Sequence, residues 1–363
     1  MAIVVMLFGS LLGPFAGAAV EVLAAGIVGI AVLRSLSVYG PVAWRTLLLA
    51  MLLIGVVAFR AWMEPPSTEY GQTKWVNFCT LAFVTMVAAV TVLERRAMKA
   101  LALWWVVCGV ALAGLALTDP ASAGGRAQVD GSNPVWLARA ISSSIVILVW
   151  LAVTKRWRWW RVLVLVPVLG AGLLATGSRG PAMAAVAGVV VLLIAPTQRR
   201  SKQIIGLVLG GVIFVVVAPL IPAVANSRFG EFISQGGVEG ESRSVMWRSA
   251  IHLITGEPLG YGIGSWKEVS GSQFDYPHNL FLEVLLEQGW LVGGALILLV
   301  LGLGHRLWKR SGRDPRLQLA LALVATETIH VSTSGDLNAR TFFFVIILGA
   351  GLLYKQRSEL AVD

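Results

Sequence analysis

Long apolar runs alternate with short polar connections along almost the whole chain. Each run approaches the roughly 20 apolar residues that an α-helix needs to cross the hydrocarbon core of a membrane. The runs lie near 15–33, 42–62, 74–93, 99–118, 134–153, 161–177, 180–196, 204–221, 278–304, 316–332 and 340–354, with a weaker one at 2–12. The pattern predicts an all-α polytopic membrane protein with about 12 transmembrane helices.

Composition and charge agree with a membrane location. The chain is 57% hydrophobic and only 13% charged, which is too little polar surface to cover a water-soluble globule. Its net charge of +10 does not indicate nucleic-acid binding, because the basic residues form short clusters between apolar runs. Cys79 and Cys108 fall inside such runs and offer neither a disulfide framework nor a metal-ligand spacing. We therefore expect no nucleic-acid partner, no metal and no cofactor.

The distribution of Lys and Arg predicts an orientation. These residues are concentrated in every second connection, for example in Arg95–Lys99 and Lys155–Arg161, and the positive-inside rule places such connections in the cytoplasm. Both termini then lie in the cytoplasm, and the alternate, more acidic connections face the periplasm. We expect a multi-pass protein of the bacterial inner membrane.

One predicted periplasmic connection, at 222–277, is much longer than the others. It contains an amphipathic segment for which Ser242 is a plausible N-cap, followed by a glycine-rich turn region at 256–264. One helical face would present Arg243, Trp247, Ala250 and Ile254, which suits a helix lying on the bilayer. We predict a single membrane domain over 1–363, with 222–277 as a lid.

Arginines on the predicted periplasmic side outnumber those that topology alone would place there. They are Arg60, Arg126, Arg139, Arg179, Arg228, Arg243, Arg248 and Arg340. A guanidinium group binds phosphate oxygens through paired donors and stays charged at any relevant pH. A diphosphate at the outer membrane surface is the ligand that these side chains suit best.

Two of these arginines have simpler interpretations as well. Arg179 lies in a very short connection between two apolar runs, where it could extend to lipid phosphates without any other role. Arg340 follows Asp336 at the spacing of a local i,i+4 ion pair.

His278 stands where the long connection meets the next apolar run. Pro277 and Asn279 mark the start of a helix. If that helix includes His278, Gly289 returns to the same face, and the imidazole points into a packed bundle. A histidine can accept a proton near neutral pH, although capping a helix is an alternative role. Two acidic residues of the same run, Glu283 and Glu287, lie on a different stripe, and we expect them to pair with periplasmic arginines.

Three motifs in this order resemble the O-antigen ligase and O-antigen polymerase family of membrane glycosyltransferases. They are Ser178-Arg179-Gly180, then Arg243 four residues before Trp247 with Pro258-Leu259-Gly260-Tyr261-Gly262 after it, then His278-Asn279 with Leu282-Glu283 and Gly289. The resemblance implies a donor glycan carried on undecaprenyl diphosphate, transferred without a metal to an acceptor hydroxyl at the periplasmic face. The acceptor is a sugar of the lipid A core for a ligase and a second lipid-linked repeat unit for a polymerase.

The resemblance also implies roles for individual residues. Arg179 and Arg243 would hold the diphosphate, and His278 would orient or deprotonate the acceptor hydroxyl. Further binding candidates are Arg340, Arg248 and Arg139.

Two other classes compete with the enzyme: a transporter or flippase of anionic lipids, and a membrane scaffold. Transporters show repeated halves and broken helices near the midplane, whereas these candidates gather at helix ends and in one loop. A scaffold leaves the arginines and His278 unexplained. We therefore favour the enzyme, with a slight preference for ligase over polymerase.

Overall fold

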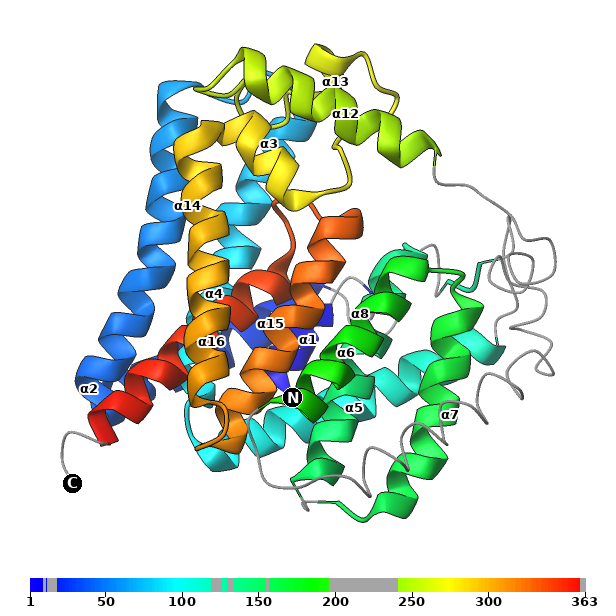
Figure 1. The fold of residues 1–363 in the computed structure, drawn as a ribbon. Helices are drawn as coiled ribbons and strands as arrows, with labels where there is room; N and C mark the ends of the chain where they lie inside the picture. The colour runs from blue at the N-terminus through cyan, green and yellow to red at the C-terminus, as the bar shows by residue number, and fades with distance from the viewer. Residues whose placement is uncertain are drawn as a thin grey trace. The chain divides into compact units, whose positions relative to one another are not determined.

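The computed structural model describes residues 1–8, 11, 18–118, 126–128, 133–154, 157–195 and 241–359. Every regular element among them is a helix (Figure 1), so the predicted all-α class is confirmed for this part of the chain. The predicted span at 204–221 and the first part of the predicted loop at 222–277 lie outside the described residues.

Five described helices are long and apolar enough to cross a membrane. They are Val22–Met63, Glu69–Val92, Arg95–Thr118, Pro134–Val153 and Leu280–Arg310. Two shorter apolar helices, Trp160–Ala175 and Arg179–Ile194, also coincide with predicted spans. These helices support a multi-pass membrane protein, whereas the count of about 12 spans stays a prediction.

Two of the predicted spans form one element with a break. Helix α2, Ala18–Met63, covers the 15–33 run from Ala18 onward and the whole 42–62 run, but Gly40 within it has φ 41° and ψ −115°. Glycine adopts positive φ at little cost, and the following Pro41 cannot donate a backbone hydrogen bond. The chain therefore kinks between the two predicted spans without leaving a loop.

One compact unit, unit 1, comprises residues 1–24, 94–238 and 307–329. Its described helices are α1 (Ala2–Phe8), α5 (Arg95–Thr118), α6 (Pro134–Val153), α7 (Trp159–Ala175), α8 (Arg179–Ile194) and most of α15 (Pro315–Ser334). The helices α5, α6 and α7 pack against one another, and α6 also packs against α8. Small side chains allow close approach, since Gly109 lies directly against Ser144 and Gly172 against Ala113.

The other unit, unit 2, comprises residues 25–93, 239–306 and 330–363. It holds most of α2, then α3 (Glu69–Asn77), η2 (Phe78–Ala82), α4 (Phe83–Ala88), η3 (Ala89–Val92), α12 (Glu241–Gly256), α13 (Trp266–Ser270), most of α14 (Leu280–Arg310) and α16 (Arg340–Glu359). The C-terminal α16 packs along η2, α4 and η3, with the rings of Phe78 and Phe343 5.4 Å apart. The division of the chain between the two units leaves the prediction of a single membrane domain untested.

The amphipathic helix α12 packs on protein. Ala250 and Ile254 are buried in a cluster with Trp266 of α13 and Leu286 of α14. The prediction that this face lies on the bilayer is therefore wrong. The helix also begins at Glu241, so Ser242 is not its N-cap.

Candidate functional site

His278 lies just outside a helix. Helix α14 begins at Leu280, because the Asn279 side-chain oxygen accepts hydrogen bonds from the backbone N–H groups of Phe281 (3.0 Å) and Leu282 (3.3 Å). His278 precedes this cap with φ 55°. The expectation that it shares a helical face with Gly289 is wrong, since the helix starts later and is itself interrupted at Gly289.

Aromatic side chains surround the half-buried His278. Its imidazole meets the rings of Tyr276 and Phe274 edge-on, at centroid distances of 4.4 and 5.3 Å. The indole N–H of Trp247 on α12 donates to the carbonyl of Pro277 at 3.1 Å. The histidine is thus held in a short segment anchored both to α12 and to the start of α14.

Arg243 lies one turn before Trp247 on the same helix. Its Nη1 donates to the carbonyl of Thr333 at 2.9 Å, near the C-terminal end of α15, where helix carbonyls carry partial negative charge. The side chain is exposed. The contact with Thr333 thus leaves Arg243 accessible to solvent.

Arg340 is the first residue of α16. Two residues later, the ring of Phe342 packs at 6.1 Å from the ring of Phe281 in the first turn of α14. The starts of α14 and α16 therefore meet, and Arg243 is tied to the end of α15 just before the connection to Arg340. We call this part of unit 2, with His278, Arg243 and Arg340, the histidine end.

Arg248 also lies on α12 and is exposed. Its Nε donates to the carbonyl of Ser244 on its own helix, at 3.3 Å. This contact directs the side chain along α12, and no described contact links it to His278.

The other two candidates, Arg179 and Arg139, belong to unit 1. Arg179 is the exposed first residue of α8, directly after Ser178, whose hydroxyl makes no capping bond to the helix. Its position adds charge to a helix N-terminus, where unsatisfied N–H groups already favour anions. Arg139 is half-buried in α6, and its carbonyl accepts a hydrogen bond from Ser142.

Sequence reasoning gave Arg126 no individual role, yet it contacts the turn that precedes Arg179. Its Nε donates to the carbonyl of Thr176 at 3.2 Å, and its Nη2 donates to the Ser178 hydroxyl at 3.0 Å. About 50 residues separate these partners along the chain, so no local motif could reveal the contact. The excess of outward arginines was the only available signal.

The acidic residues of α14 pair with a lysine. The buried ammonium group of Lys74 on α3 binds Glu283 Oε1 and both carboxylate oxygens of Glu287, the latter at 2.7 Å. The predicted ion-pair role of Glu283 and Glu287 is correct, but the expected arginine partners are not the ones found.

The glycine-rich segment 258–264 packs against the break in α14. The backbone N–H groups of Tyr261 and Gly262 donate to the carbonyls of Leu286 (2.8 Å) and Glu287 (3.0 Å), and Trp290 N–H donates to Pro258 (2.9 Å). A Cβ on Gly260 would lie 2.5 Å from the backbone nitrogen of Gly289. Glycine is therefore required here for close backbone approach.

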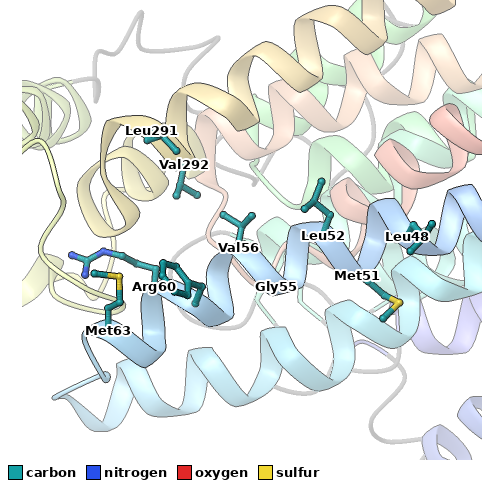
Figure 2. A pocket seen from close by; sticks show the side chains of 10 residues that line it. Leu48, Met51, Leu52, Gly55, Val56, Arg60, Met63, Leu291 and Val292 are labelled. Carbon is teal, nitrogen blue, oxygen red and sulfur yellow. The ribbon is translucent and has the colours of Figure 1, made fainter.

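An apolar groove of about 620 Å³ runs along α2 (Figure 2). Its α2 wall comprises Leu48, Met51, Leu52, Gly55, Val56, Phe59 and Met63, and Leu291 and Val292 of α14 form the facing wall. Arg60 stands near one end, where its guanidinium pairs with Glu64 and donates to the Gly260 carbonyl at 2.9 Å. Because both helices are candidate membrane spans, the groove can take a hydrocarbon chain.

Comparison with known families adds one decisive observation. Residues 167–298 match the O-antigen ligase family. The match confirms the resemblance inferred from the three motifs and contains Arg179, Arg243, Arg248 and His278, while Arg139 and Arg340 lie outside it. A search of curated proteins found no match to this chain.

The O-antigen ligase match and the apolar helices together indicate a multi-pass bacterial membrane protein with ligase-type or polymerase-type activity. Within the described ranges, no group of three or more His, Cys, Asp or Glu residues could hold a metal ion. The chemistry available at the histidine end consists of an imidazole, two guanidinium groups and aromatic surfaces.

Proposed function

We propose that this protein transfers a glycan from undecaprenyl diphosphate to an acceptor sugar hydroxyl at the periplasmic face of the bacterial inner membrane. The observation that carries the proposal is the histidine end, where His278, Arg243 and Arg340 are held by contacts among α12, α14, α15 and α16. Two of these three residues lie in the segment that matches the O-antigen ligase family.

His278 acts on the acceptor. Its imidazole takes the proton of the acceptor hydroxyl as that oxygen attacks the anomeric carbon of the donor glycan. A new glycosidic bond forms, and the bond between the anomeric carbon and the diphosphate oxygen breaks, leaving its electron pair on the diphosphate. Direct displacement of this kind inverts the anomeric configuration.

The arginines act on the donor. Arg243 and Arg340 bind the diphosphate and stabilise the negative charge that grows on it as the bond breaks. Arg179 is proposed for the same task on the strength of the motif resemblance and of its exposed position at a helix N-terminus. Arg248 and Arg139 are weaker candidates for binding the donor. Because guanidinium groups supply the positive charge, the reaction requires no metal.

The apolar groove beside Arg60 offers a place for the lipid carrier. Its lining extends from Leu48 to Met63, which is about 22 Å along a helix and suits a long hydrocarbon chain. The hydrocarbon chain of the lipid would lie against α2 and against the part of α14 that follows Gly289.

The test is transfer by purified protein in detergent from a synthetic undecaprenyl-diphosphate glycan, with no added metal or nucleotide. Lipid A core and a second lipid-linked repeat unit are offered in parallel as acceptors. We expect product on the lipid A core, as for a ligase. A ladder on the lipid-linked acceptor would instead make the protein a polymerase. Folded protein that binds the donor and transfers to neither acceptor contradicts the proposal and favours a transporter.

A further inference from the structure

A buried charge cluster includes two acidic residues from the first turns of α14, just after His278. It consists of Lys74 from α3 and of Glu283 and Glu287, which lie one turn apart on α14. No side chain of the three is more than 1% exposed. We call it the Lys74 clamp. Buried charges are expensive to desolvate and are kept only where they are well paired.

The clamp joins three parts of unit 2. Lys74 links α3 to the first half of α14, before the break at Gly289. The Glu287 carboxylate also accepts a hydrogen bond from the backbone of Gly264, and the Glu287 carbonyl accepts one from Gly262 at 3.0 Å. The short helical segment after His278 is thus fixed to α3 on one side and to the glycine-rich segment on another.

The backbone of His278 needs such support. Its φ of 55° lies in the left-handed region, which residues other than glycine rarely adopt and which persists only where the surroundings enforce it. On the N-terminal side, Trp247 holds the Pro277 carbonyl. On the C-terminal side the backbone enters the first turn of α14. Glu283 belongs to this turn and is bound by Lys74.

We propose that Lys74, Glu283 and Glu287 are positioning residues for His278. They fix the start of α14 and so hold the imidazole where it meets the acceptor hydroxyl, without touching the substrate themselves. The part of this inference that concerns transfer rests on the proposed function, whereas the part that concerns the backbone of His278 does not.

The main test separates positioning from charge balance. Lys74→Met leaves two buried carboxylates without a cation, so it is compared with Lys74→Met/Glu283→Gln/Glu287→Gln, which is neutral and similar in volume. Lys267→Met is the matched control, because it removes an exposed lysine whose 3.2 Å pair with Asp275 lies in the same unit. Four properties are measured: thermal stability, backbone hydrogen exchange at 276–283, the rate of diethyl pyrocarbonate modification of His278, and kcat and KM for transfer.

We expect the neutral triple variant to melt close to the wild type, yet to exchange at least about 10-fold faster at 276–283. Its His278 should react faster with diethyl pyrocarbonate, and kcat should fall by about 10- to 100-fold while KM for the donor changes little. Lys74→Arg, which keeps a bridging cation, should restore part of the lost exchange protection. The Lys267→Met protein should match the wild type in every measurement.

A triple variant with wild-type exchange, modification and kcat would overturn the proposal. The clamp would then only neutralise buried charges and would not position His278. If the triple variant does not fold, the single variants decide. Glu283→Gln should loosen 276–283 more than 258–264, and Glu287→Gln should do the reverse; identical patterns for the two contradict the proposal. A wild-type protein without transfer activity refutes the proposed function, and hydrogen exchange and His278 modification then still test positioning.

Discussion

The turn before α8 and the turn before α14 both place a candidate site residue at the start of a helix, but they hold it differently. Arg179 is exposed, and the residues before it accept hydrogen bonds from the Arg126 guanidinium through the Thr176 carbonyl and the Ser178 hydroxyl. His278 is half-buried, adopts a left-handed backbone, and is followed by a helix whose first turns are bound to buried Lys74.

The difference agrees with the roles proposed for the two side chains. A guanidinium group attracts a diphosphate through a permanent charge as well as through paired hydrogen bonds. An imidazole that takes a proton has to lie within hydrogen-bond reach of one oxygen in one orientation. The turn at His278 is accordingly the one that is followed by a buried ion pair.

The largest effect is expected from substitution of His278, the proposed proton acceptor. Asparagine tolerates a left-handed backbone but cannot act as a base, so His278→Asn should keep the fold and lower kcat by about 100- to 10,000-fold. Steady-state transfer and donor binding are measured on the same preparation. Donor affinity should stay within about threefold of the wild type, since binding is assigned to arginines. A His278→Asn protein with full transfer activity would show that His278 is not the base that the proposed reaction requires.

Substitutions of Arg179 and Arg243 should weaken donor binding, and the loss of Arg243 should also lower stability. Arg179→Ala and Arg243→Ala should each weaken the donor interaction by about 10- to 100-fold, because each removes charge-assisted hydrogen bonds to phosphate. Arg243→Ala should also lower the melting temperature, since Arg243 holds the carbonyl of Thr333. Lysine substitutions at both positions serve as controls and should recover part of the affinity. An unchanged melting temperature in Arg243→Ala would contradict a structural role for its contact with Thr333.

The break in α14 should depend on one glycine. In Gly289→Ala, the new Cβ would lie 2.6 Å from the Leu259 carbonyl oxygen, and φ is 83°. We expect a loss of about 1–3 kcal/mol in the free energy of unfolding. Gly294→Ala is the matched control, because a Cβ there meets nothing within 4 Å, and it should be neutral or slightly stabilising. Denaturant unfolding of both variants in detergent gives the comparison.

The smallest effect is expected in the groove. A Cβ on Gly55 meets nothing within 4 Å, so Gly55→Leu should fold normally while filling part of the space for a lipid chain. Donor affinity should fall by about 3- to 10-fold, whereas a short-chain donor should bind as before. Gly29→Leu, at an equally open glycine of α2 outside the groove lining, should leave both affinities unchanged.

Hydropathy alone predicted most of the described helices. The 134–153 run coincides with α6 to the residue, because Asn133 caps it and Pro134 begins it, which are both local signals. The apolar runs at 15–33 and 42–62 gave no sign that Gly40 and Pro41 join them into one kinked element. Hydropathy measures the length of an apolar run, but it does not show whether a turn or a kink divides it.

The candidate site was less predictable for a related reason. The motif around His278 was recognisable, and the matched family confirms it over 167–298. The partners of that motif could not be read from the sequence, since Lys74 lies more than 200 residues from Glu283 and forms no pattern with it. The face of α12 was misassigned because an apolar stripe looks the same whether lipid or Leu286 covers it.

The most direct measurement of the central claim is the identity of the lipid product. Purified protein is given radiolabelled undecaprenyl-diphosphate glycan and lipid A core, and the lipids are separated as transfer proceeds. Cleavage between the sugar and the diphosphate predicts undecaprenyl diphosphate in amounts equal to the transferred glycan, formed at least about 100-fold more slowly by His278→Asn. Recovery of undecaprenyl monophosphate, or of intact donor beside a folded protein that binds it, would contradict the account.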